Sequence, residues 1–327
     1  MKDIYFDDNY GKLYEKCEHG KAVVYKCETE KGTIVNQFIK REIPLKINGK
    51  TFYDIVTPYG YGGPYIVETT NKKELLNDYE KEFTKYCEKN NIVAEFVRFH
   101  PLFDNAKEME EIYHPFYNRH TLGTNLKDYE DPVQSEFSKS CRQNIRKKLE
   151  LGMEYKVTVN PTNFDKFKKC YYSTMERNEA TDYYYFDDEY FNKIHKLYGP
   201  NTILVETIYN GETIAAGLYY ICNKIIHIHL SGTLKEYLHL SPAYILRYGV
   251  TKWGKENGYE MIHHGGGRSS SEEDTLYLFK KQFAKNTKFD FYLGKKIWNQ
   301  QVYDELCEKA NVSKDEEFFP AYRKVLK

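Results

Sequence analysis

YEMIHHGGGRSSSEEDTLYLFKK, residues Tyr259–Lys281, is the stretch from which the fold of this chain is best predicted. Its first part, Tyr259–His264, is a short half-apolar run bounded by glycines, which is typical of a strand. The run Gly265–Gly267 allows a sharp backbone turn that residues with a Cβ atom do not permit. The apolar residues that follow recur at helical spacing: Leu276, Phe279 and Phe283. We therefore predict a strand, a glycine loop and a helix.

A helix that starts directly after the glycine loop offers a place for a negatively charged group. Ser271, with Asp274 three residues later, is a capping box that marks a helix start. Free N–H groups and the positive end of the helix dipole favour an anion there. We expect the floor of an acyl-transfer or phosphate site, with an ordinary strand–turn–helix and a solvated lysine as the alternative. The candidate residues are Gly265, Gly266, Gly267 and Lys280.

Composition limits the classes of function. The 327 residues are enough for two domains at about 150 residues each. Lys+Arg and Asp+Glu both number 48, so the chain lacks the overall basic field of a dedicated nucleic-acid binder, and we do not expect DNA as a partner. No apolar run approaches the roughly 18 residues of a membrane helix, and the N-terminus lacks the apolar core of a secretory signal. Seven cysteines without CxxC spacing indicate reduced thiols and a cytoplasmic protein.

A second unusual loop, PYGYGGP, spans Pro58–Pro64. Three glycines and two prolines in seven residues make its backbone conformationally special. Its tyrosines are suited to wall a pocket, since functional residues favour loops on a rigid scaffold. A surface loop that only turns is the alternative. The substrate-binding residues expected in this half of the chain are Tyr59, Tyr61, Gly63 and Arg98.

The most basic short stretch is a predicted helix, Ser138–Leu151, with Gly152 as its C-terminal cap. Arg142 and Arg146 are four residues apart, so they share one helix face and are candidates for bidentate phosphate binding. The alternative is a solvated helix whose cations favour its C-terminal end through the dipole.

The second half continues with a meander of three strands joined by tight turns. These strands are predicted at Ile203–Ile208, Ile214–Cys222 and Ile225–Leu230. His227 and His229 share one strand face, but no cysteine or carboxylate is spaced to complete a metal site, so we expect none. Histidines that line a partly polar cleft, His263 among them, are the preferred interpretation. The sequence also lacks a P-loop, a GxGxxG dinucleotide motif and a GxSxG elbow.

The order of elements and four motifs resemble a known family. The second half is similar to the FemAB-like (FemABX) branch of the GNAT acyltransferase superfamily, whose Fem members are aminoacyltransferases that build peptidoglycan cross-bridges. In chain order, the four motifs correspond to the family's basic helix, to its Thr-x-x-Arg segment, to its central strand, and to its glycine loop followed by a Phe-Lys helix. The stretches are Arg142–Arg146, Thr174–Arg177, Ile214–Gly217, and Gly265–Gly267 followed by Leu276–Lys280.

The resemblance implies an α+β fold with two tandem GNAT-like domains, each a mixed β-sheet flanked by helices. Residues 1–152 would form the acceptor side and 153–299 the acyl-donor side, with 300–327 returning to the first domain. It also implies that Lys280 stabilises the oxyanion of the tetrahedral intermediate and that Arg177 holds an anionic substrate group.

The resemblance implies an acyltransferase that forms an amide bond on an amine of an envelope precursor, either UDP-sugar or lipid-linked, in peptidoglycan or polysaccharide synthesis. Aminoacyl-tRNA is the favoured co-substrate over acyl-CoA, because Ser231–Ser241 lacks the Q/R-x-x-G-x-G/A signature of acetyl-CoA binding. No permanent cofactor is expected, and peripheral contact with the inner membrane face fits a lipid-linked precursor. The alternatives are an acyl-CoA-dependent N-acyltransferase acting on a nucleotide sugar and a non-catalytic GNAT-like binding module.

Overall fold

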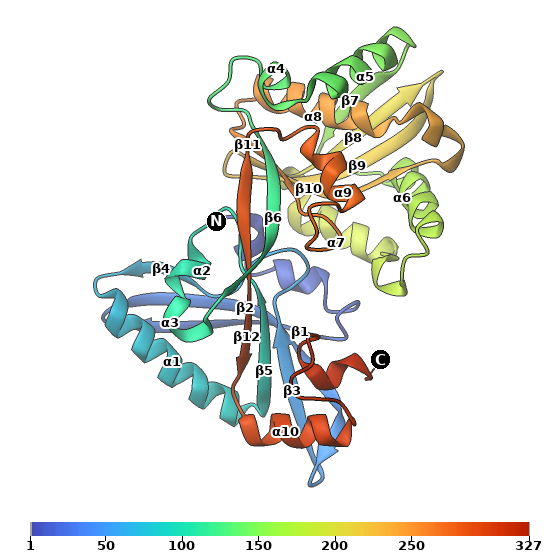
Figure 1. Ribbon diagram of the computed structural model, residues 1–327. Helices are drawn as coiled ribbons and strands as arrows, with labels where there is room; N and C mark the ends of the chain where they lie inside the picture. Colours follow the sequence, from blue (N-terminus) through green and yellow to red (C-terminus); the bar gives the residue numbers. More distant parts are fainter. Residues whose placement is uncertain (1, 327) are drawn as a thin grey trace. The chain divides into compact units, whose positions relative to one another are not determined.

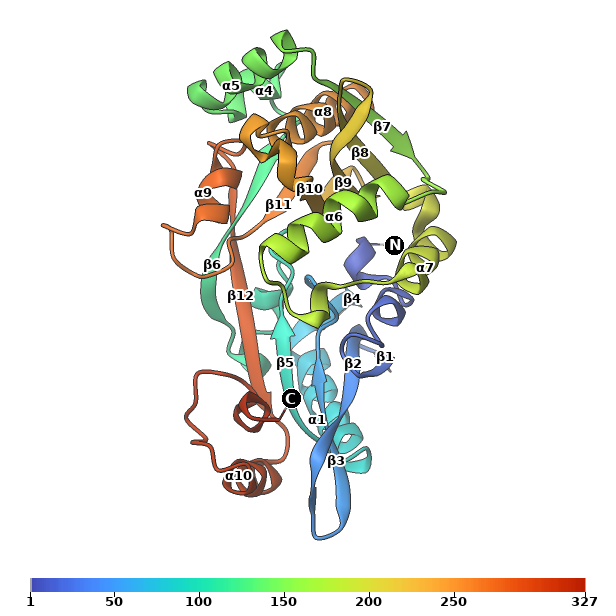
Figure 2. The ribbon, with the colours of Figure 1, turned by 90° about the vertical axis from the view of Figure 1, so that its right-hand side faces the viewer.

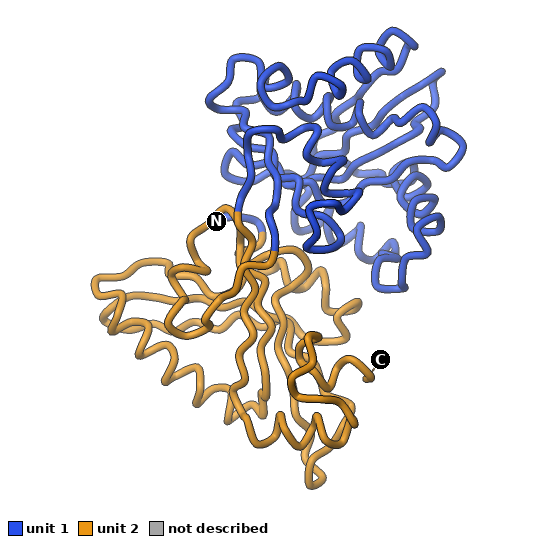
Figure 3. The backbone as a smooth tube through the Cα atoms, viewed as in Figure 1, with its two compact units in different colours: residues 1–4, 119–289 blue, residues 5–118, 290–327 orange. Residues whose placement is uncertain are grey.

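The computed structural model describes residues 2–326. The chain divides into two compact units (Figure 3). Unit 1 comprises residues 1–4 and 119–289, and unit 2 comprises residues 5–118 and 290–327. Residues 290–327 belong to the same unit as residues 5–118. The domain bounds expected from the resemblance, 1–152 and 153–299, stay a prediction.

Unit 1 is a mixed sheet in the order β6-β11-β10-β9-β8-β7 (Figure 1). β10 and β11 run parallel and the other neighbours are antiparallel. The meander predicted from the tight turns is confirmed as β8, β9 and β10. The strands are β6 (Phe116–Asn125), β7 (Glu154–Val159), β8 (Thr202–Tyr209), β9 (Glu212–Cys222), β10 (Ile225–Thr233) and β11 (Met261–Gly265).

Helices cover both faces of this sheet (Figure 2). α6 packs on β9 and β10, and α8 packs on β7, β8 and β9. The core under α8 holds Leu246 and Val250, four residues apart on one helix face, against apolar residues of β8 and β9. The helices are α4 (Pro132–Glu136), α5 (Lys139–Glu150), α6 (Asp165–Arg177), α7 (Asp188–Tyr198), α8 (Ala243–Glu256) and α9 (Thr275–Lys281).

Within unit 2 the strands follow the order β1-β2-β3-β5-β12, with β4 paired to β2. β3 and β5 are parallel. α1 packs on β1, β2 and β5, and α10 packs on β2 and β5. The elements are β1 (Gly20–Thr29), β2 (Gly32–Ile47), β3 (Lys50–Val56), β4 (Tyr65–Thr69), α1 (Lys72–Lys89), β5 (Ile92–Arg98), α2 (Asn105–Glu108), α3 (Glu110–Tyr113), β12 (Lys288–Ile297) and α10 (Gln300–Lys309).

Each unit is a mixed sheet flanked by helices, so the predicted α+β class is confirmed. Two segments of unit 2 are shaped by local packing and backbone geometry. Residues 5–18 form short 3-10 turns, Ile4–Phe6 and Tyr10–Leu13, because their aromatic side chains are buried in the unit and do not follow one helix face. β6 starts at Phe116, because His114 takes a left-handed conformation and ends α3 before Pro115.

A buried carboxyl group gives unit 2 a pH-dependent stability. Glu95 is 1 % exposed and accepts hydrogen bonds from Asn36 Nδ2 at 2.8 Å, Tyr113 OH at 2.9 Å and Trp298 Nε1 at 3.0 Å. Burial nevertheless raises the pKa of Glu95 to about 7. The folded state therefore holds this proton more tightly than the unfolded state, whose glutamate has an ordinary pKa.

Stability should fall as the pH rises through this window. Between pH 5 and 8 we expect the unfolding free energy of the wild type, relative to Glu95→Gln, to drop by about 2–3 kcal/mol. Urea titrations of both proteins at several pH values measure this difference. Parallel pH profiles for the two proteins would contradict it.

Candidate active site

The glycine loop of unit 1 is shaped by one aspartate. Asp274 Oδ1 accepts from Tyr277 N at 2.9 Å, and its Oδ2 accepts from Arg268 N at 3.1 Å and Ser269 N at 3.0 Å. These N–H donors lower the pKa of the Asp274 carboxyl to about 2. A Cβ at Gly267 would lie 2.6 Å from Asp274 Oδ1, so only glycine fits there. The N-cap of α9 is thus Asp274, and the predicted capping box begun by Ser271 was wrong.

Asp274→Ala is expected to loosen this loop, because it removes both a helix cap and the acceptor for two loop N–H groups. We expect a loss of about 1 kcal/mol and faster amide exchange at residues 268–277. Hydrogen–deuterium exchange measures this effect. Asp131→Ala, which removes the N-cap of α4, is the matched control and should leave exchange in the loop unchanged. An unchanged loop in Asp274→Ala would contradict the prediction.

Lys280 turns back from α9 onto the glycine loop. Its Nζ donates to Gly266 O at 2.6 Å. Burial, together with the charges of Arg247 and Arg119, lowers the pKa of Lys280 to about 7. Arg119 itself holds the loop from the β6 side, since its Nη1 donates to Gly267 O at 2.8 Å and to Ser269 O at 3.0 Å. The lysine is therefore a fixed, readily titrated cation.

The far end of α9 is held by a buried glutamate. Glu136, at the end of α4, accepts from Asn286 N at 2.9 Å and from Thr287 Oγ1, and its carbonyl oxygen accepts from Lys285 N at 2.9 Å. Asn125 N also donates to its carboxylate at 3.3 Å. α9 is thus anchored both at its N-cap and directly after its last turn, which restricts the movement of Lys280.

The Thr174-x-x-Arg177 motif joins α6 to the end of β10. Thr233 N donates to Thr174 Oγ1 at 2.8 Å, and Thr174 Oγ1 donates to Thr233 O at 3.2 Å. Arg177 Nη1 also reaches Thr233 O, at 3.4 Å. Burial and the neighbouring charge of Arg268 lower the pKa of the Arg177 guanidinium, so this arginine lies near the glycine loop.

Most histidine side chains of β10 and β11 are buried in the interior of unit 1. His263 is 2 % exposed, with its ring 5.7 Å from that of His227, so it lies inside the sheet. His264, the next residue, is 1 % exposed and its Nε2 lies 2.7 Å from Thr124 Oγ1. Burial, Arg247 and Lys280 lower the pKa of His264 well below its ordinary value, so its ring is neutral and lies close to the lysine.

The two arginines of α5 differ. Arg142 Nη1 donates to Phe137 O at 2.5 Å and to Gln134 O at 3.2 Å, so its guanidinium fastens the preceding turn. Arg146 is exposed. Of the two, only Arg146 presents its charge fully to solvent, and the prediction that both bind phosphate stays a prediction.

In unit 2 the chain brings Arg98 against the glycine–tyrosine loop. Gly62 N donates to Arg98 O at 2.8 Å, and the Arg98 guanidinium donates to Thr57 O just before the loop. Among residues 2–326, Arg98 Nε is buried without a hydrogen-bond partner. Tyr59 O accepts from Tyr10 OH at 2.8 Å, while the ring of Tyr61 packs edge-on against Phe291. Gly63, at φ +80°, lies against Val97.

Comparison with known proteins identifies the domain that carries Lys280. Residues 135–281 match the family described as acetyltransferase (GNAT) domain. The match covers 147 of the 327 residues. This GNAT-matching region holds the glycine loop, Arg142, Arg146, Arg177 and Lys280.

Similar proteins confirm the predicted resemblance to the FemAB-like branch. The chain is 23 % identical, over 175 residues, to UDP-N-acetylmuramoylpentapeptide-lysine N(6)-alanyltransferase of Weissella viridescens, and the match covers 53 % of this chain. The chain spans about half the length of that relative, 51 %.

Solved structures extend the likeness beyond the GNAT domain. FemX has a TM-score of 0.67 at 14 % identity, covering 91 % of this chain and 92 % of that one. The C-terminal domain of a putative lysylphosphatidylglycerol synthetase from Agrobacterium fabrum has a TM-score of 0.58 at 13 % identity, covering 94 % and 92 %. At these identities the likeness concerns the fold alone.

The GNAT domain gathers some predicted residues and adds others. Lys280, Gly266 and Gly267 lie together, and Arg177 lies near the same loop through Arg268. The sequence analysis missed three residues beside Lys280: Arg119, Arg247 and His264. A signal was present for Arg247, which stands on the apolar face of its helix one residue after Leu246.

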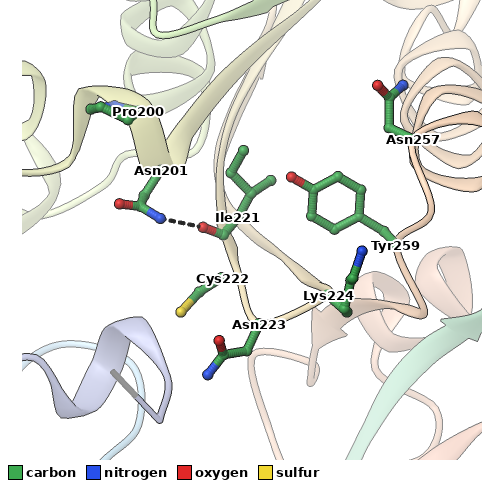
Figure 4. Close-up of a pocket in the computed structure, with 8 residues that line it drawn as sticks. All are labelled: Pro200, Asn201, Ile221, Cys222, Asn223, Lys224, Asn257 and Tyr259. Carbon is green, nitrogen blue, oxygen red and sulfur yellow. Dashed lines mark hydrogen bonds between the residues drawn. The ribbon is translucent and has the colours of Figure 1, made fainter.

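A pocket of about 240 Å³ opens elsewhere in the GNAT domain, at the turn between β9 and β10 (Figure 4). Its lining is largely polar, and Lys224 and Tyr259 point into it. None of the predicted site residues lines this pocket. Across residues 2–326, no helix combines the length and the apolar character needed to cross a lipid bilayer.

Proposed function

We propose that this protein is a FemAB-like aminoacyltransferase that forms an amide bond between an activated aminoacyl group and an amine on a peptidoglycan precursor. Aminoacyl-tRNA is the favoured donor. The protein would act in the cytoplasm, in keeping with seven cysteines that lack CxxC spacing. No permanently bound cofactor takes part in this proposal.

The observation that carries the proposal is the position of Lys280. Its ammonium group is fixed beside the glycine loop of a GNAT domain by a 2.6 Å hydrogen bond to Gly266 O. When an amine nitrogen attacks the carbonyl carbon of an ester, the C=O electron pair moves to oxygen. A fixed cation at that oxygen lowers the barrier. The intermediate then collapses, the C–O bond to the ribose breaks, and the amine proton leaves with the ribose hydroxyl.

Other cations of unit 1 suit a polyanionic donor. Arg146 is exposed on α5, and Arg177 and Arg268 lie together near the glycine loop. Such groups attract phosphates and release counterions, so binding of a tRNA donor would weaken steeply with salt. We assign Arg177 to an anionic group of the substrate and leave Arg142 a structural role, because its guanidinium already holds two backbone carbonyls.

Unit 2 would recognise the acceptor. The similar alanyltransferase of Weissella viridescens is named for the lysine N6 of a UDP-N-acetylmuramoyl pentapeptide. Arg98 has a buried Nε without a partner among the described residues, and it lies against the loop that carries Tyr59, Tyr61 and Gly63. Its guanidinium, whose Nη2 lies 3.9 Å from Glu18 Oε1, is a candidate to bind an anionic, sugar-linked precursor. With a lipid-linked precursor the same unit would meet the inner membrane face.

A transfer assay tests the donor. The full chain is incubated with UDP-N-acetylmuramoyl pentapeptide and, in parallel, with tRNA charged with labelled alanine or with labelled acetyl-CoA. Label in the precursor from charged tRNA, lost on raising the salt, is the expected result. Label from acetyl-CoA alone would favour the second candidate, a CoA-dependent N-acyltransferase on a nucleotide sugar, which the acetyltransferase name of the matching family supports.

The assay also separates an enzyme from a binding module. If the protein binds charged tRNA and the precursor but transfers no group, whichever amino acid and precursor are tested, catalysis is rejected. The third candidate, a non-catalytic GNAT-like binding module, would then remain. Mass spectrometry of the precursor distinguishes these outcomes directly, since an added aminoacyl group changes its mass.

A further inference from the structure

The pocket at the turn between β9 and β10 takes no part in the proposed reaction. It measures about 240 Å³, a little below the range of about 300–1,000 Å³ that drug-sized ligands occupy, so it suits a smaller molecule. Its lining comes from three places in unit 1: the start of β8, the β9–β10 turn, and the segment between α8 and β11 (Figure 4).

Lys224, which points into this pocket, occupies a backbone position that suits glycine. The two residues of the β9–β10 turn, Asn223 and Lys224, both have positive φ, 44° and 67°. Such turns favour Asn-Gly, because a Cβ atom is strained in the left-handed region. The turn between β8 and β9 has this favoured pair, Asn210 and Gly211. A strained lysine in the second turn indicates that its side chain has a role of its own.

The ammonium group of Lys224 is not used inside the protein. Across residues 2–326 it forms neither a hydrogen bond nor an ion pair. A Cβ at Gly258 would lie 3.8 Å from Lys224 Nζ, so the ammonium group lies beside the residue that follows the C-cap of α8. Among the eight residues that line the pocket, all within the described chain, none is acidic. The pocket therefore presents one positive charge without a counter-charge.

Two asparagines in the lining present hydrogen-bond acceptors. Asn201 Nδ2 donates to Ile221 O at 3.0 Å (Figure 4), and Asn257 Nδ2 donates to Trp253 O at 2.8 Å. These bonds orient each amide, and the Oδ1 atoms accept no hydrogen bond within residues 2–326. Asn257 also caps α8, and the negative end of the helix dipole favours a positively charged group there. This part of the lining suits a cationic donor.

We propose that this pocket binds a free α-amino acid. The carboxylate binds Lys224 Nζ and the hydroxyl group of Tyr259, and the ammonium group binds the amide oxygens of Asn201 and Asn257. One lysine balances one carboxylate, whereas a phosphate dianion would leave a negative charge unbalanced. A zwitterion therefore matches the whole lining better than a simple anion does.

Thermal unfolding distinguishes a ligand-binding lysine from a structural one. Lys224→Gly relieves the strain at positive φ, so its melting temperature should exceed that of the wild type by about 2 °C. Gly211→Lys is the matched control, because an added Cβ there has no atom within 4 Å and only the backbone is strained. It should melt about 2 °C below the wild type. If Lys224→Gly melts below the wild type, the lysine stabilises the end of α8 and the proposal fails.

Binding is measured by isothermal titration calorimetry with L-alanine and L-leucine as probes. We expect saturable binding of at least one of them to the wild type. Propionate lacks the ammonium group and alaninamide lacks the carboxylate, so each should bind about tenfold or more weakly than L-alanine. If neither amino acid binds, or if propionate binds as well as L-alanine, the proposal is wrong.

Variants locate the binding site. Lys224→Gly and Lys224→Met should each weaken amino-acid binding about tenfold or more, and Tyr259→Phe should weaken it several-fold. Lys280→Met should bind the amino acid as the wild type does. Binding that is unchanged in both Lys224 variants, or lost in Lys280→Met, would place the amino acid elsewhere and overturn the proposal.

This test does not depend on transfer activity. A protein that binds an amino acid at Lys224 but transfers no acyl group would retain the pocket and lose the proposed reaction. Active transfer without amino-acid binding would reject the pocket alone.

Discussion

Lys280→Met is expected to lower kcat about 10²–10³-fold, the loss typical of removing one donor to a developing oxyanion. Methionine keeps the length of the side chain but removes its positive charge and its hydrogen bond to Gly266 O. The charge matters chiefly when the carbonyl oxygen becomes negative. We therefore expect the KM for the acceptor to change little.

Lys281→Met is the matched control. It is the next residue on the same helix but is exposed, with its Nζ 5.9 Å from the ring centre of Tyr277. Its turnover should remain within a few-fold of the wild type. Steady-state transfer assays with both variants measure the difference. If Lys280→Met turns over as fast as the wild type, Lys280 has no role in the mechanism. If Lys280→Met and Lys281→Met lose the same amount of turnover, the effect comes from the lower positive charge of the helix and not from the position of Lys280.

Local patterns were sufficient to predict most of the unit 1 fold. The glycine run before Leu276 and Phe279, and the turns at Asn210-Gly211 and Asn223-Lys224, encode their own backbone geometry. The structure has positive φ at Asn210, Gly211, Asn223 and Lys224, as such turns require. These elements were predictable because a few neighbouring residues determine them.

The residues that surround Lys280 were not predictable in the same way. Arg247 and Arg119 reach the lysine from α8 and β6, far from it in the sequence, so no spacing rule relates them. Pattern analysis singled out His263, but it is His264 that the structure places near the lysine. Successive strand residues point to opposite faces of a sheet, and the sequence does not tell which face meets α9.

Tertiary contacts also decided the roles of equivalent residues. Arg142 and Arg146 share a helix face and look alike in sequence. The Arg142 guanidinium nevertheless donates to the carbonyl oxygen of Phe137, whereas Arg146 is exposed. The N-terminal residues 5–18 show the same limit. Burial of their aromatic side chains holds them in short 3-10 turns instead of one helix.

The contribution of Lys280 should disappear as the pH rises. Its pKa of about 7 means that the ammonium form predominates below neutral pH and the neutral amine above it. Burial is the main cause of this value, Arg247 and Arg119 also favour the neutral form, and Asp274 favours the charged one. His264 is neutral throughout this range, because its pKa lies well below its ordinary value. Only the ammonium form stabilises an oxyanion by charge.

The quantity to measure is the ratio of kcat/KM between wild type and Lys280→Met from pH 5.5 to 9. Ionisation of the acceptor amine affects both proteins equally and cancels in the ratio, and kcat/KM reports groups of the free enzyme. We expect a plateau below pH 6 and a fall of about tenfold per pH unit above 7, until the two proteins become equal. The same ratio for Lys281→Met should stay flat. A ratio that rises with pH would mean that the neutral amine is the active form, so that Lys280 accepts the proton of the attacking amine and the oxyanion must be stabilised by other groups.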